Sequence, residues 1–140
     1  MKIFNPSKIT SKYRANLILS TYKNLLRDGD KVLDIGCGTG VVAFFLQNNL
    51  KIKITGCDIK NYLAHQISFV LIKENKKLPF KNKSFDVVML NDVLHHIKEP
   101  NQYKILREAL RVGKKVLIFE AKPTFSGKLF DIILNKLHYG

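Results

Sequence analysis

A glycine-rich turn followed by a carboxylate is the part of this sequence best suited to hold a nucleoside. Residues 34–40 read Asp-Ile-Gly-Cys-Gly-Thr-Gly, and Asp58 stands 18 residues after Gly40. Glycine lets the backbone turn with positive φ and lets a ligand approach without a Cβ in the way. A helix behind the turn supplies free N–H groups, and a carboxylate can accept two hydrogen bonds from a ribose diol. We therefore predict a nucleoside site; the alternative for Asp58 is a solvated strand end.

The spacing of the turn argues against two common phosphate-binding loops. The dinucleotide fingerprint G-x-G-x-x-G needs glycine at position 41, where this chain has Val41. The phosphate loop G-x-x-x-x-G-K-[ST] is absent from the sequence. A nicotinamide-dependent dehydrogenase is therefore a remote alternative.

Candidate catalytic groups follow the fourth apolar run of the chain: Asp92, His95 and His96. Imidazole accepts a proton near neutral pH, so either histidine could act as a general base. Adjacent residues on a helix point about 100° apart, so we do not expect both rings in one site; the alternative is that one ring packs and the other is solvated. We predict no metal site, because no cysteine or carboxylate stands at ligand spacing.

Alternating strand and helix patterns must position these residues. Continuous apolar runs predict strands at 31–35, 52–57, 67–72, 85–90 and 115–120, and helical spacing predicts helices at 8–27, 39–50, 101–112 and 127–138. This pattern predicts an α/β domain, a Rossmann-like three-layer α/β/α fold with a parallel five-stranded sheet in the order 3-2-1-4-5. Ligands bind such sheets beyond the carboxyl ends of the strands.

Length and composition indicate one globular domain over residues 1–140. The chain is 46% hydrophobic and 25% charged, which excludes wholesale disorder and fibrous repeats. The two cysteines, Cys37 and Cys57, are too few for a disulfide framework. We expect both to be small buried groups without an activated thiolate. We also expect a cytoplasmic protein with neither a membrane span nor a signal peptide.

The net charge of +13 has two explanations. Lysine (20), isoleucine (14) and asparagine (11) are the residues that an AT-rich genome favours, and the lysines are scattered along the chain. The alternative is an anionic partner, either nucleic acid or a membrane surface.

Four motifs in register resemble the class I S-adenosylmethionine-dependent methyltransferases. They are VLDIGCGTG at 32–40, CD at 57–58, LPFKNKSFDVVMLNDVLHHI at 78–97 and LREALRV at 106–112. The likeness is nearest to the small type 11 branch, which includes quinone-biosynthesis methyltransferases, and covers about residues 30 to 120. It implies the cofactor S-adenosylmethionine, the product S-adenosylhomocysteine and methyl transfer to an acceptor, most simply a small molecule, that the sequence does not identify.

The resemblance also implies roles for the residues of the turn. Gly36, Gly38 and Gly40, with Cys37 among them, would lie under the methionine and ribose of the cofactor. Asp34 would brace the turn or help to hold the ammonium group of the methionine part.

Residues after the later strands complete the implied site. Asp58, beside Ile59, would bind the ribose hydroxyls. Glu74 would accept a hydrogen bond from the adenine amino group, with the backbone N–H of Asn75 beside it; the alternative for Glu74 is an ordinary exposed loop acid. Asn91 would lie near the methionine part.

The chain departs from the family at two places. Only the eight residues 59–66 separate Asp58 from the third strand, where relatives fit a helix, so we expect a loop with Tyr62 and Leu63 packed into the gap. The chain stops where relatives add an antiparallel hairpin, which suggests a truncated product. We expect the hairpin to be absent, residues 127–138 to be helical, and 115–120 to be an edge strand.

The exposed edge and the basic charge leave further possibilities open. The edge could be covered by the last helix, by a second copy or by a partner chain. The last helix could instead lie on a membrane surface. A cofactor-binding or degenerate subunit that needs a partner, and a nucleic-acid-binding module, are the alternatives to an active methyltransferase.

Overall fold

The computed structural model describes residues 6–121 and 129–135, with side chains described over 10–120. Its helices are α1 (Pro6–Tyr22), α2 (Val41–Asn49) and α3 (Asn101–Val112), and a short 3-10 helix, η1, covers Leu94–His96. Its strands are β1 (Lys31–Ile35), β2 (Lys53–Asp58), β3 (Ser68–Leu71), β4 (Phe85–Asn91), β5 (Gly113–Ala121) and β6 (Leu129–Asn135). None of the described helices is long and apolar enough to cross a lipid bilayer.

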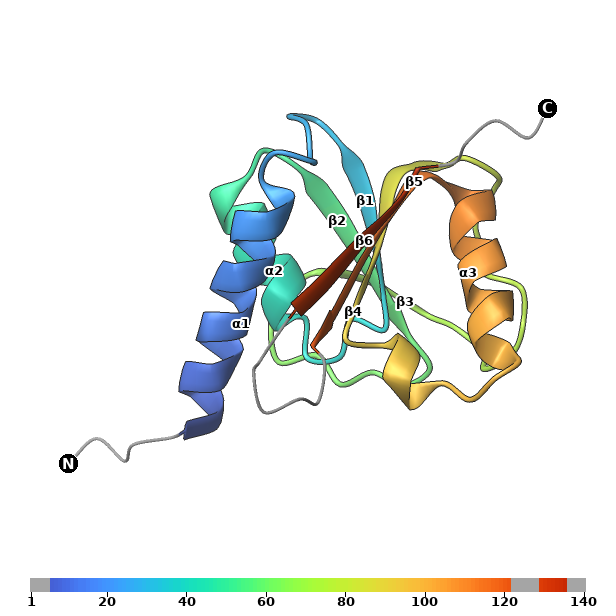
Figure 1. The fold of residues 1–140 in the computed structure, drawn as a ribbon, viewed down its shortest axis with the longest axis horizontal. Coiled ribbons are helices and arrows are strands. Elements are labelled where there is room, and N and C mark those ends of the chain that lie inside the picture. Colours follow the sequence, from blue (N-terminus) through green and yellow to red (C-terminus); the bar gives the residue numbers. More distant parts are fainter. Residues whose placement is uncertain (1–5, 122–128, 136–140) are drawn as a thin grey trace.

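The elements form three layers, as predicted. Helices α1 and α2 cover one face of the sheet and α3 covers the other (Figure 1). The strand order is β3-β2-β1-β4-β5-β6, and the first five strands are parallel. The predicted order 3-2-1-4-5 is therefore confirmed.

The register of the central strands decides where the site lies. Ile35, the last residue of β1, pairs with Cys57 of β2 on one side and with Leu90 of β4 on the other. Gly36, which follows β1, and Asp58 and Asn91, the last residues of β2 and β4, therefore stand at the same edge of the sheet. This edge lies at the bottom of Figure 1, close to the short η1 helix.

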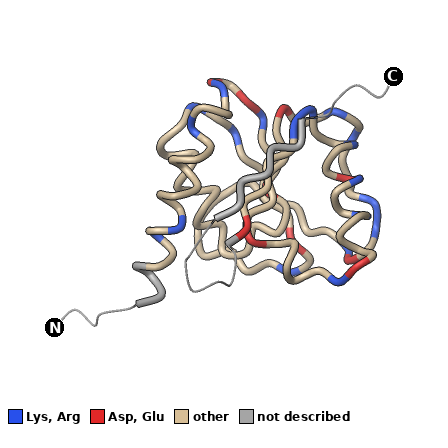
Figure 2. The backbone as a smooth tube through the Cα atoms, viewed as in Figure 1, with Lys and Arg blue, Asp and Glu red and all other residues tan. Residues whose placement is uncertain are grey.

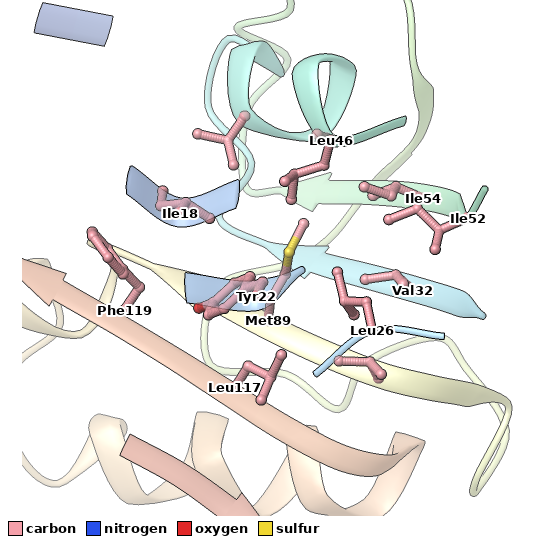
Figure 3. Close-up of a cluster of buried hydrophobic side chains, with 13 residues drawn as sticks. Ile18, Tyr22, Leu26, Val32, Leu46, Ile52, Ile54, Met89, Leu117 and Phe119 are labelled. Atoms are coloured by element: carbon pink, nitrogen blue, oxygen red, sulfur yellow. The ribbon is translucent and has the colours of Figure 1, made fainter. Parts of the chain in front are cut away.

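Two apolar cores lie on the two faces of the sheet. The core under α1 and α2 is drawn in Figure 3 and includes Ile18, Tyr22, Leu26, Val32, Leu46, Ile54, Met89 and Phe119. The core under α3 includes Leu33, Ile35, Val88, Leu90, Ala109, Val112, Val116 and Ile118. Because both faces are covered, β4 is buried along nearly its whole length, as its unbroken apolar sequence predicts.

The carboxyl-terminal segment differs from the prediction of a helix over 127–138. The structure pairs β6 with β5 in antiparallel register, from Asn135 opposite Lys115 to Leu129 opposite Ala121. A short and almost wholly apolar run suits a buried strand as well as a helix. The pairing occupies backbone groups that β5 would otherwise expose. The predicted edge strand is therefore wrong, and of the antiparallel hairpin that was expected to be absent the described residues contain one strand, β6. The ends of the expected helix lie outside the described residues.

The connection between β2 and β3 is a loop, as its length predicts. The backbone N–H groups of Ala64 and His65 donate to the carbonyl oxygen of Thr39, at 3.0 and 3.2 Å, which ties the loop to the glycine turn. Leu63 is half-buried beside Gly40. Tyr62, in contrast, is half exposed and lines the cavity described below, so the expectation that it fills the gap is wrong.

Removing one buried leucine should show that α2 is held by its packing on the sheet. Leu46 is fully buried in the core that Figure 3 shows. Leu46→Ala should therefore lower the free energy of unfolding by about 2–5 kcal/mol in chemical denaturation. Asn48→Ala, at an exposed position of the same helix, should change it by less than about 0.5 kcal/mol. Equal effects of the two variants would contradict this packing.

Candidate cofactor site

A cavity of about 1370 Å³ opens at the carboxyl ends of β1, β2 and β4. Its walls come from the glycine turn, the segments after β2, β3 and β4, and parts of α1 and α3. Most sequence-predicted residues line it: Asp34, Gly36, Cys37, Gly38, Asp58, Ile59, Glu74, Asn75, Asn91, Asp92, His95 and His96. The structure therefore brings together residues that are up to 62 positions apart in the chain.

The carboxylate of Asp58 holds the glycine turn through a hydrogen bond from its backbone. One oxygen, Oδ2, accepts a hydrogen bond from the N–H of Gly38 at 3.0 Å, and the other, Oδ1, accepts one from the N–H of Ile59 at 2.8 Å. An ionised carboxylate offers about four lone-pair positions, so two remain for a ligand. The resemblance implied that Asp34 would brace the turn or help to hold an ammonium group; in the structure, the carboxylate that accepts a hydrogen bond from the turn is that of Asp58.

The three glycines of the turn have different reasons to be glycine. All three have positive φ, but only Gly38 has open space, with nothing within 4 Å of the position a Cβ would occupy. A Cβ at Gly36 would meet the Val93 side chain at 2.7 Å, and one at Gly40 would meet Leu63 at 3.0 Å. Gly40 does not line the cavity; it lies where the turn packs against the β2–β3 loop.

Asp34 is a buried carboxyl group in the floor of the cavity. Its exposed fraction is 2%. Burial raises its pKa from the ordinary value of 3.8 to about 7; the positive charge of Arg14 opposes the shift, and the negative charge of Asp58 adds to it. Asp34 therefore changes its charge near neutral pH, where a cationic ligand would favour the ionised form.

The two cysteines are unreactive in this setting. Both are buried and free. Burial, with the negative charges of Asp34 and Asp58 nearby, raises the pKa of Cys37 to about 12, and the same causes raise the pKa of Cys57. Since the thiolate is the nucleophilic form, the prediction of no activated thiolate agrees with the structure.

Asn91, at the end of β4, carries an unused donor. Its side-chain oxygen accepts a hydrogen bond from the Tyr22 hydroxyl at 2.8 Å. Its amide nitrogen Nδ2 is buried and has no partner among the described residues. An unpaired buried donor costs about 1–3 kcal/mol. Because Asn91 also lines the cavity, a ligand acceptor atom at this point would satisfy it.

Arg14 of α1 is a site residue that the sequence did not predict. Its Nη2 donates to the backbone oxygen of Asn91 at 3.2 Å, and its Nε lies 2.5 Å from Oδ2 of Asp92. Arg14 stands four and eight residues before the buried Ile18 and Tyr22, so it lies on the inward face of the helix. The sequence does contain one indication of this: Arg14 stands at helical spacing from the apolar residues Ile18 and Tyr22.

The two adjacent histidines share one wall of the cavity, contrary to the prediction. They lie in η1, a 3-10 turn, and their ring centroids are 3.9 Å apart. The Nδ1 atom of His95 lies 2.7 Å from Oε2 of Glu120, at the end of β5. Glu120 is distant in sequence and was not predicted as a site residue. A carboxylate therefore does approach His95, although none stands near it along the chain.

Asp92, His95 and Glu120 together form a possible cation-binding group. One ligand atom from each lies within 4.8 Å of the other two. The Arg14 guanidinium already supplies a positive charge beside Asp92. Asp92 Oδ2 and Glu120 Oε2 are already engaged by Arg14 and His95, so an ion bound through these two oxygens would compete with both contacts.

The LPF segment is fixed by an ion pair on α3. Glu108 accepts a hydrogen bond from the N–H of Leu78 at 2.7 Å, and Arg111 donates to the Leu78 oxygen at 2.9 Å and to Glu108 at 2.7 Å. Hydrogen bonding to Arg111 lowers the pKa of Glu108, which keeps the carboxylate ionised. This pairing holds the segment that starts at Glu74 and Asn75 along the cavity.

Exposed basic side chains surround the outer part of the cavity. Lys and Arg gather on α3 and on the segment beside it (Figure 2). Those that line the cavity from these two sides are Lys73, Lys76, Lys77, Lys98, Lys104 and Arg107. The lining as a whole is mixed in charge, because Asp34, Asp58, Glu74, Asp92 and Glu108 also line the cavity.

Comparison with known proteins identifies the family. A family model described as a methyltransferase domain matches residues 33–118, more than half of the chain. Phosphoethanolamine N-methyltransferase 3 of Arabidopsis thaliana is 28% identical over 130 residues, which cover 81% of this chain and 26% of the relative. The 27-O-demethylrifamycin SV methyltransferase of Amycolatopsis mediterranei is 33% identical over 99 residues, which cover 62% of this chain and 36% of the relative.

A solved structure supports the same conclusion at the level of the fold. The phosphoethanolamine N-methyltransferase 2 of Haemonchus contortus, crystallised with phosphomonomethylethanolamine and S-adenosylhomocysteine, superposes with a TM-score of 0.61 and 23% identity. The match covers 79% of this chain and 30% of that one. The chain thus spans about a quarter to a third of the length of these proteins. From the match to residues 33–118 and the fold that carries them, the chain belongs to the methyltransferase domain family.

Proposed function

We propose that the chain binds S-adenosylmethionine in this cavity and transfers its methyl group to an acceptor bound beside it. The observation that carries the proposal is the pair of Gly38 and Asp58. Gly38 leaves open space above the turn, and Asp58 is oriented by two backbone N–H groups with lone pairs to spare. A ribose diol fits the second feature, and the close passage of the ligand past the backbone fits the first.

The other buried polar groups fit the methionine part of this cofactor. The unpaired Nδ2 of Asn91 would donate to an acceptor atom of the ligand. Asp34, buried in the floor of the cavity, would stand opposite the ammonium group. Arg14 lines the same part of the cavity from α1.

The adenine would lie on the side formed by the segment after β3. Glu74 and Asn75 are exposed there and line the cavity, and Asn75 has a φ of 56°, which turns the chain at this point. Glu74 would accept from the adenine amino group and the Asn75 N–H would donate to the ring. The ion pair of Glu108 and Arg111 would keep this segment in place.

The bound sulfonium would supply an already activated methyl group, so the residues of the chain have mainly to position the acceptor and exclude water. Good alignment of two reactants contributes about 7–11 kcal/mol to lowering a barrier. Candidates for a general base are Asp92, His95 and His96, all on the cavity wall. Asp92 is already paired with Arg14, which favours the histidines.

The acceptor is proposed to be a small molecule that carries negative charge. The six basic side chains around the outer cavity, against two acidic ones on the same segments, Glu74 and Glu108, favour such a ligand. Nucleic acid is the alternative, and it predicts binding that weakens steeply with salt. A subunit that binds the cofactor but transfers no methyl group without a partner is a further alternative. The two free cysteines favour a reducing, cytoplasmic location.

Adding a side chain above the turn should block the cofactor. S-adenosylhomocysteine should raise the melting temperature of the wild-type chain, and Gly38→Asn should weaken its affinity by about tenfold or more in calorimetry. Asparagine tolerates positive φ, so the fold should survive. Gly29→Asn is the control, because Gly29 also has positive φ and open space but lies outside the cavity. Equal affinities of the two variants would rule out the assignment of the turn.

Asp58→Asn should weaken S-adenosylhomocysteine binding by about 10–100-fold. The amide has one uncharged acceptor oxygen in place of the charged carboxylate that would accept hydrogen bonds from the ribose hydroxyls. Asp86→Asn is matched, since Asp86 also accepts from a backbone N–H, that of Lys31 at 2.9 Å. Asp86 lies at the opposite end of the sheet, outside the cavity. Isothermal titration of both variants gives the comparison, and a normal affinity for Asp58→Asn would remove the ribose role.

Binding of the cationic ligand should remove a proton from Asp34. With a pKa of about 7, Asp34 is about half protonated at pH 7, and a nearby ammonium group favours its ionised form. Titration with S-adenosylmethionine in two buffers of different ionisation enthalpy should therefore show a release of up to about half a proton per ligand. The release should grow towards pH 6, vanish at pH 9 and be lost in Asp34→Asn. Buffer-independent heats at pH 7 would contradict the role.

A further inference from the structure

The contact between Glu120 and His95 joins two elements that no sequence motif connects. Oε2 of Glu120 lies 2.7 Å from Nδ1 of His95, and Oε1 of Glu120 accepts a hydrogen bond from the N–H of Leu94 at 2.7 Å. Both oxygens of the carboxylate are therefore engaged by η1. Glu120 is only 21% exposed, whereas the His95 side chain is 49% exposed.

The frame around this contact is fixed by backbone pairing. Asn91 pairs with Phe119 in the parallel ladder of β4 and β5, and the N–H of Asp92 donates to the Phe119 oxygen at 2.7 Å. The chain after β4 must therefore cross the end of β5, where Glu120 stands. The Gln102 side chain holds the turn from the other side, by donating to the oxygens of Leu94 and Ile97 at 2.8 and 2.9 Å.

This arrangement selects one tautomer of the His95 ring. An ionised carboxylate only accepts hydrogen bonds, so the ring nitrogen that faces it, Nδ1, must carry the hydrogen. The lone pair then lies on Nε2, on the other side of the ring. Because His95 lines the cavity and its side chain is half exposed, Nε2 is the nitrogen left for a ligand.

We propose that His95 is the general base of this site and that Glu120 is its positioning residue, so that the acceptor is a group which carries a proton on its attacking atom, such as a hydroxyl. The proposal rests on the proposed function. As the acceptor atom forms its bond to the methyl carbon, its own proton passes to Nε2 of His95, and the electron pair of the breaking carbon–sulfur bond stays on sulfur. The positive charge moves from sulfur to the imidazole ring, where Glu120 stabilises it.

A tertiary amine has no proton to give, so His95 and Glu120 would contribute nothing to its methylation. A hydroxyl acceptor, in contrast, gains from a base held in the correct tautomer; general base catalysis contributes about 10²–10⁴-fold. Glu120 without that role would be a structural residue that anchors η1 to β5. The two roles differ in what they require of the Nδ1 atom, and the test uses that difference.

The variant Glu120→Gln separates the roles. The Gln oxygen still accepts from the Leu94 N–H, so the anchor remains, but its NH₂ group faces Nδ1 and can only donate. His95 must then carry its hydrogen on Nε2. Ring ¹⁵N spectra, with His95→Gln to assign the signal, should show hydrogen on Nδ1 in the wild type and on Nε2 in Glu120→Gln. Hydrogen on Nε2 in the wild type would overturn the proposal.

A second test asks whether Nε2 of His95 lies near the position of the transferred methyl group, and it needs no known acceptor. Sinefungin carries a primary amine where S-adenosylmethionine carries its sulfonium methyl group, so its N–H can donate to Nε2. Sinefungin, but not S-adenosylhomocysteine, should shift the Nε2 signal, and its affinity should fall about tenfold in Glu120→Gln. The affinity for S-adenosylhomocysteine should be unchanged. Glu99→Gln, the same change at an exposed position near η1 with no contact to His95 in the described structure, is the control.

The outcomes separate the failure of this inference from failure of the proposed function. If S-adenosylhomocysteine does not bind the wild-type chain, the proposed function fails. If S-adenosylhomocysteine binds, but sinefungin leaves the Nε2 signal unshifted or binds the wild type and Glu120→Gln equally, only the roles of His95 and Glu120 are overturned. A Zn²⁺ titration that shifts the His95 ring ¹⁵N signals in the wild type but not in Glu120→Gln would overturn the proposal and assign Asp92, His95 and Glu120 to a metal. Melting temperatures of all variants verify that each one folds.

Discussion

The shared edge at which β1, β2 and β4 end is the constraint on which the site depends. Parallel pairing in register forces Gly36, Asp58 and Asn91 to leave the sheet together. The turn after β1 can then be closed by a hydrogen bond from its own backbone to the carboxylate after β2. The carboxylate proposed to bind the ribose therefore also holds the turn, through the N–H of Gly38.

Sequence reasoning succeeded where the signal is local. The strands are continuous apolar runs, the turn has its glycines at fixed spacing, and Asp58 and Asn91 lie directly at strand ends. It failed where packing between distant segments decides. Arg14 lines the cavity from α1, and Glu120 of β5 contacts the cavity residue His95; the partners of both are distant along the chain. The prediction of a helix over 127–138 failed for another reason, since the short apolar run of β6 is compatible with both a helix and a strand.

The acidic residues of the cavity differ in their surroundings, and this gives them different chemistry. Asp34 is buried without a hydrogen bond among the described residues and therefore titrates near neutral pH. Asp58 is oriented by two backbone donors, and Asp92 is paired with a guanidinium. Three aspartates that line one cavity therefore have three different electrostatic environments.

The two attachments of α1 to residues 91 and 92 have a consequence for motion. Tyr22 holds the Asn91 side chain, and Arg14, two helical turns earlier, holds the backbone of Asn91 and the side chain of Asp92. A change in the position of Asn91 would therefore alter contacts that both Tyr22 and Arg14 of α1 make. The amino-terminal helix is therefore fastened to the end of β4 at two points, so losing one contact leaves α1 attached there through the other.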